Sequence, residues 1–144
     1  MIYDKFLTVA SAQAVTASAV SGDSIDLSQA RDMGEGEGIT MMFSVDEAPA
    51  TATSIEFQVI SSAAANLGTP TVLGTSGAIA IANLPAGTLV PVKINAKIGS
   101  LGQRYLGANF VVAGSNATAG KFTAGVVKDI QDGRKAYASG FSVV

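Results

Sequence analysis

The 144-residue chain has the length of a single domain and is long enough to bury a hydrophobic core. Hydrophobic residues make up 48% of it, charged residues 14%, and the formal net charge is −2. This composition excludes a disordered chain. Because cysteine and histidine are both absent, it also excludes disulfides, thiolate or imidazole metal sites, and the Ser–His–Asp and Cys–His arrangements of nucleophilic catalysis.

No secretion or membrane signal is expected. The N-terminus lacks a basic segment followed by an apolar one, as a signal peptide would have. Residues 57–92 carry no charge, but glycine and proline interrupt them, so no apolar stretch reaches the ~20 residues of a spanning helix. We therefore expect a soluble protein with no membrane partner.

The chain begins with an unusually apolar segment that contains Ile2, Tyr3, Phe6 and Leu7. Such a segment packs either on its own domain or on a neighbouring subunit. Ile2, Tyr3 and Phe6 are therefore candidate interface residues.

Short strands follow from residue 15 onward. Apolar and polar residues alternate over 15–19, and after a Ser-Gly-Asp turn the next strand is expected at 24–27. Asp32, Glu35 and Glu37 then lie among glycines. We expect a solvated turn here. A cation site is the alternative, because carboxylates bind hard cations, and paired catalytic carboxylates are a more remote one.

The middle of the chain shows the clearest period-two alternation. Inward-facing apolar residues predict strands at 39–45 and 55–59, with an acidic, proline-containing loop at 46–50 between them. Later strands are expected at residues 79–81, 90–94, 105–112 and 122–126, separated by turns at 83–87 and 113–116. Pro91 cannot donate to a sheet ladder, which places the strand at 90–94 at an edge or at a bulge.

About eight short strands with no helical period between them indicate an all-β fold. We expect one domain over residues 1–144, an antiparallel sandwich of two sheets, of jelly-roll type.

Charge is unevenly distributed along the chain. Residues 1–72 hold nine acids and two bases, and residues 73–144 hold two acids and seven bases. Acidic and basic strands that pair across one sheet explain this pattern. A charged protein–protein contact is the alternative. Nucleic-acid binding is not expected, because few aromatic residues lie among the basic ones.

Arg104 and Tyr105 open one of the expected strands, and both residue types are enriched at the anchors of protein interfaces. We take both as interface candidates. The alternative is a surface arginine whose aliphatic stem packs on the sheet.

Three motifs in the C-terminal half carry a family resemblance: 102–107 (GQRYLG), 110–112 (FVV) and 118–127 (TAGKFTAGVV). Together with the opening Met-Ile-Tyr-Asp, they resemble the small cement (decoration) capsid proteins of podovirus-like tailed phages, a family whose type member comes from a Bordetella phage. The resemblance is best over residues 100–130.

This resemblance implies a jelly-roll protein bound as a homodimer, with a trimer as the alternative, to the outer surface of a shell of phage major capsid protein. It implies a virion location after assembly in the bacterial host cytoplasm. It implies no active site and no cofactor.

Two other classes remain open beside capsid cement. A carbohydrate- or ligand-binding module needs an exposed aromatic platform, yet the chain has no tryptophan and three tyrosines. A hydrolase needs two carboxylates that converge in a cleft. We expect a structural protein that is not an enzyme.

Overall fold

The computed structural model of the chain describes residues 4–28, 38–94 and 103–127. Its elements are the 3-10 turns η1 (Lys5–Leu7) and η2 (Ile81–Asn83) and the strands β1 (Thr8–Ala14), β2 (Ala19–Val20), β3 (Ile25–Asp26), β4 (Thr40–Ser62), β5 (Thr71–Ala80), β6 (Leu89–Lys93) and β7 (Tyr105–Val127). The seven strands belong to one antiparallel sheet in the order β1-β7-β4-β5, with β2 and β3 also paired to β7 and β6 to β4. The predicted all-β class is confirmed.

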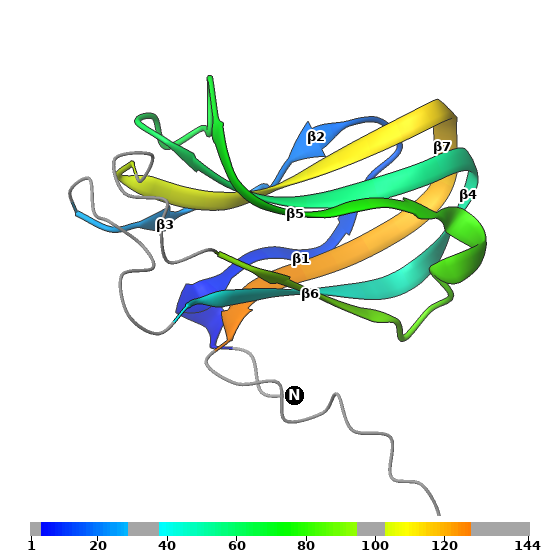
Figure 1. Cartoon of the computed structure of the whole chain (residues 1–144), viewed down its shortest axis with the longest axis horizontal. Helices are drawn as coiled ribbons and strands as arrows, with labels where there is room; N and C mark the ends of the chain where they lie inside the picture. Colours follow the sequence, from blue (N-terminus) through cyan, green and yellow to red (C-terminus); the bar gives the residue numbers. More distant parts are fainter. Residues whose placement is uncertain (1–3, 29–37, 95–102, 128–144) are drawn as a thin grey trace, which may run out of the picture.

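Two strands organise this sheet. β4 and β7 are each 23 residues long and pair with each other from end to end. Both bend midway, so that the sheet folds back over itself in two layers (Figure 1). The layered arrangement therefore comes from a single continuous sheet. A separate second sheet and a jelly-roll strand order do not emerge among the described strands.

The bend divides the sheet into two halves. The β6 half consists of β1, β6, residues 40–47 of β4 and residues 121–127 of β7. The β5 half consists of β2, β3, β5 and the remaining ends of β4 and β7. The predicted loop at 46–50 and the predicted turn at 113–116 both lie inside these long strands, where the register between β4 and β7 shifts. The largest shift lies between the pairs Ala50–Ala119 and Ala52–Gly114.

The bend has a specific backbone requirement at Gly114. This residue has φ +82°, and a Cβ added to it would lie 2.9 Å from Cβ of Thr53 on the facing strand. Only glycine fits both conditions. Beside Ala52, the partner of Gly114 in β4, Thr51 has φ +67°, an uncommon value for a β-branched residue. The backbone N–H of Thr118 donates to Oγ1 of Thr51 at 3.1 Å. The hydrogen bond helps to hold Thr51 in this conformation.

The core lies between the two halves and centres on four fully buried phenylalanines. Phe43 and Phe122 come from the β6 half, and Phe57 and Phe110 from the β5 half. Ring centroids are 5.1 Å apart for Phe43 and Phe57 and 5.3 Å apart for Phe57 and Phe122. These are favourable tilted and edge-to-face geometries. The inward positions of the alternating pattern thus meet across the fold.

Side-chain contacts also close the side of the molecule formed by β1 and β2. The Nε2 of Gln13 in β1 donates to the carbonyl of Val20 at 2.9 Å, and the backbone N–H of Gly22 donates to its Oε1 at 2.9 Å. One side chain of the β6 half therefore satisfies backbone groups of the β5 half. The backbone N–H of Asp23 also donates to the carbonyl of Val9 in β1 at 3.0 Å, so side-chain and backbone bonds together join the two halves here.

We expect the substitution Phe57→Ala to lower the free energy of unfolding by about 3–5 kcal/mol, because it leaves a cavity in contact with three other rings. The same substitution at Phe6, whose side chain is 88% exposed, should change the free energy by less than about 0.5 kcal/mol. Urea unfolding of the two variants measures both values. Equal effects at the two positions would contradict a core centred on the phenylalanines.

Candidate interaction site

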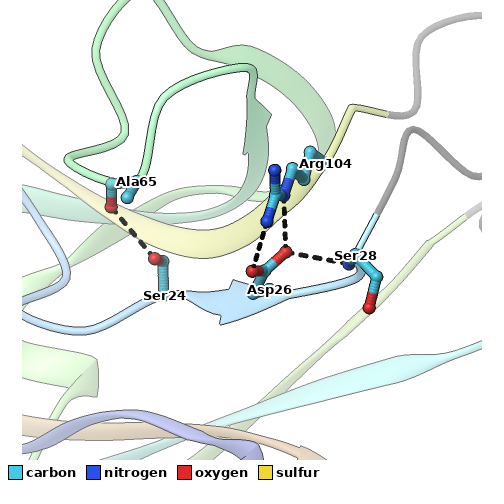
Figure 2. A network of polar contacts seen from close by, with 5 residues as sticks. All are labelled: Ser24, Asp26, Ser28, Ala65 and Arg104. Carbon is cyan, nitrogen blue, oxygen red and sulfur yellow. Dashed lines mark hydrogen bonds and ion pairs between the residues drawn. The ribbon is translucent and has the colours of Figure 1, made fainter.

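Arg104, the predicted interface arginine, forms an ion pair within the chain. Its Nε lies 2.8 Å from Oδ1 of Asp26, and its second guanidinium nitrogen, Nη2, lies 2.9 Å from Oδ2 (Figure 2). This is the bidentate geometry that the planar guanidinium favours. The Arg104 carbon Cζ also lies 5.1 Å from the centroid of the Tyr105 ring. Arg104 therefore contacts both Tyr105, the other predicted interface residue beside it, and Asp26, which was not predicted to take part.

The pair fastens the short strand β3 to the start of β7. Asp26 also accepts a hydrogen bond from the backbone N–H of Ser28 at 2.8 Å, and the backbone N–H of Leu27 donates to the carbonyl of Arg104 at 2.9 Å. Ser24, which directly precedes β3, donates through its hydroxyl to the carbonyl of Ala65 at 2.9 Å (Figure 2). A strand of two residues needs such additional bonds to remain in place.

The ion pair shifts the pKa of both side chains. The hydrogen bond from Arg104 is the main cause that lowers the pKa of Asp26 to about 2, with a further contribution from the Ser28 N–H. The same bond raises the pKa of Arg104. The side chains are 48% and 46% exposed, so solvent and salt screen their attraction. Both side chains therefore stay charged across the physiological pH range.

A second ion pair crosses the sheet near the bend. Nζ of Lys121 in β7 lies 2.9 Å from Oε2 of Glu47 in β4, and this hydrogen bond raises the pKa of Lys121. Together with the pair of Asp26 and Arg104, it joins the acidic N-terminal half of the sequence to the basic C-terminal half. The predicted cross-strand pairing of opposite charges is confirmed.

Phe6, the third candidate in the described residues, lies on η1 and is 88% exposed. The backbone N–H of Phe6 donates to Oδ1 of Asp4 at 2.9 Å. Leu7 beside it is 38% exposed. Within the described part of the chain, no hydrogen bond, ion pair or ring contact joins Phe6 to Arg104 or Tyr105. The other two candidates, Ile2 and Tyr3, lie outside the described residues.

The outer face of the β5 half carries a polar network that the sequence reasoning missed. The side-chain amide of Asn109 donates to Oε1 of Gln58 at 2.8 Å, and Gln58 in turn donates to Oε1 of Glu56 at 2.9 Å. Thr75 donates to the same Glu56 oxygen at 2.5 Å, and this bond is the main cause that lowers the Glu56 pKa. The outward positions Glu56 and Gln58 were visible in the alternation, but their cross-strand partners were not.

The expected solvated turn with Asp32, Glu35 and Glu37, for which a cation site is the alternative, lies outside the described residues. Within residues 4–28, 38–94 and 103–127, no three acidic side chains come together as metal ligands would. No helix in the same part of the chain is long and apolar enough to cross a membrane.

The described part of the chain is thus an all-β domain whose exposed charged side chains include two ion pairs across the sheet. The family model Bbp16 matches it over residues 9–126, and the chain belongs to the Bbp16 family. The family name points to a phage-associated protein. No curated protein matches the sequence.

The lowered pKa of Asp26 makes a pH-dependent contribution to stability. Because the folded state holds this carboxyl at a pKa of about 2, against 3.8 for the free side chain, the folded state binds fewer protons between these values. The contribution is therefore complete above about pH 5 and is lost as the pH falls through 4 toward 2. Asp26→Asn should be less stable than the wild type at pH 6 and approach it at pH 2.

Urea unfolding at several pH values, at low salt, measures this convergence. Raising the salt concentration should narrow the gap at pH 6, because both side chains are exposed. Parallel stability curves for the two proteins over the whole pH range would show that the pair does not stabilise the fold.

Proposed function

We propose that this chain is a structural cement protein that binds the outer surface of a phage head and stabilises contacts between major capsid proteins. Membership of the Bbp16 family over residues 9–126 carries the proposal, because it points to a phage association. The two motifs that resemble cement proteins are 102–107 and 118–127, within or beside the matched range. Their described residues lie at the start of β7 and in its second half. The proposed location is the virion, with assembly in the host cytoplasm.

The physical character of the domain supports a binding role without catalysis. Charged residues make up 14% of the chain, and in the described part several of them already pair with one another. A surface rich in small neutral side chains loses little solvation when a partner covers it. A rigid domain of this kind can add contact area between capsid subunits while carrying out no reaction.

A carbohydrate-binding module is the alternative, and one observation weighs against it. Aromatic platforms for sugar rings need exposed rings, whereas Phe43, Phe57, Phe110 and Phe122 are all fully buried. Among the described residues, Phe6 is the one aromatic side chain that is clearly exposed, and one ring on a turn offers no platform. We therefore keep cement as the proposed function.

Co-sedimentation with capsids stripped of decoration proteins tests the proposal. We expect the wild type to sediment with the particles at micromolar concentration. Failure to do so, together with a clear hit on a glycan array, would replace cement by the carbohydrate-binding alternative.

A charge swap is needed to test whether Arg104 contributes to this binding. Arg104→Asp alone would place two carboxylates next to each other and destabilise the fold by repulsion. The double variant Asp26→Arg/Arg104→Asp restores an opposite pair while exchanging its orientation. If Arg104 contacts the shell, the swap regains stability in urea but not sedimentation. If the swap regains both stability and sedimentation, the ion pair only stabilises the fold, and the capsid shell contacts another part of the surface.

We further propose that the chain self-associates as a homodimer, with a trimer as the alternative. The low charge of the chain supports this, since little like-charge repulsion opposes contact between two copies. Light scattering of the purified protein up to high concentration should give twice the mass of the chain. A monomer at every concentration would refute self-association.

A further inference from the structure

The turn η1, which precedes β1, exposes the aromatic ring of Phe6 to solvent. Three hydrogen bonds to Asp4 close the turn: Phe6 N–H to Oδ1 at 2.9 Å, Leu7 N–H to the carbonyl at 3.0 Å, and Thr8 Oγ1 to the carbonyl at 2.8 Å. Thr8 is itself the first residue of β1 and pairs with Gly125 of β7. The turn is therefore tied directly to the sheet.

The ring of Phe6 gains nothing from burial in the described fold. A phenylalanine at 88% exposure leaves almost its whole ring in water, where burial would be worth about 1.5–3 kcal/mol. The backbone of the turn does not need an aromatic side chain, because the bonds to Asp4 use main-chain groups of Phe6 and Leu7. A rigidly presented, exposed aromatic ring has the properties of an interface anchor.

Within the described residues, no cluster of clearly exposed, large apolar side chains offers a socket for this ring on a second copy of the chain. This favours a different protein as the partner of the ring. In residues 4–28, 38–94 and 103–127, the large apolar side chains that are clearly exposed are Phe6 itself, its neighbour Leu7, and Val72 at 45%. Val72 lies alone on β5 and cannot line a pocket by itself.

We propose that Phe6 is the apolar anchor of the contact with the capsid shell and inserts into an apolar pocket on the major capsid protein, with Asp4 as its positioning residue. This inference rests on the proposed cement function and names the contact that would carry it. Phe6 precedes the matched range 9–126, so its role as the anchor draws on the geometry of this chain, while the capsid shell as its partner comes from the proposed function.

The test compares four single variants in co-sedimentation with stripped capsids. Phe6→Ala removes the ring and should weaken binding about 10- to 100-fold, the range expected for a buried aromatic side chain. Asp4→Ala keeps the ring but removes the side-chain acceptor, and should weaken binding less. Asp4→Asn keeps an acceptor oxygen at the same place and should bind as the wild type does. Val72→Ala, which truncates the other exposed apolar side chain, serves as the matched control and should bind normally.

Urea unfolding and light scattering on the same variants separate the possible outcomes. All four should unfold near the wild-type urea concentration and keep the wild-type mass. Wild-type binding of Phe6→Ala, beside a wild type that does bind, overturns the anchor and leaves the cement function standing. Loss of self-association by Phe6→Ala also overturns it, because the ring would then face a second copy. Failure of the wild type itself to bind capsids refutes the cement function, whatever the variants do.

Discussion

The packing of four phenylalanines between the two halves of one bent sheet is the contact on which the rest of this structure depends. Phe43 and Phe122 meet Phe57 and Phe110 only because β4 and β7 turn back together and keep their mutual pairing through the turn. Each long strand contributes one ring to each half. The same two strands therefore supply both faces of the core and the connection between them, and no separate second sheet is needed to cover the apolar side.

The bend transfers a local backbone constraint to the whole fold. Gly114 lets β7 approach Thr53 of β4 more closely than any side chain would permit, and Thr51 takes a left-handed conformation on the same stretch of β4. Such a residue is costly, by about 1–3 kcal/mol, unless its surroundings compensate. Here the main chain of β7 supplies a donor to the Thr51 hydroxyl, so the two strands support each other at the point of greatest curvature.

Sequence periodicity predicted the elements whose residues alternate between core and solvent. It failed where a residue's partner lies far away in the sequence. The alternation at 39–45 and 55–59 identified the inward faces of β4, and Pro91 correctly marked β6 as an edge, since β6 pairs with β4 alone among the described strands. Residues 46–50 resembled a loop because acids and Pro49 interrupt the alternation, yet bulged pairing with β7 carries the strand through them. Asp26 and Arg104 are 78 positions apart, and only the strand order brings them together.

The pairing of charged side chains within the fold affects how the surface can bind a partner. Arg104 and Lys121 meet Asp26 and Glu47 within the fold, and Glu56 is engaged by Thr75 and Gln58. Charges that are already paired steer an approaching molecule weakly, because their fields largely cancel at a distance. Binding through neutral and apolar groups draws its free energy from the removal of surface from water, which salt screens little. A ring such as that of Phe6, fixed on a capped turn beside a rigid sheet, supplies this free energy without first having to be ordered.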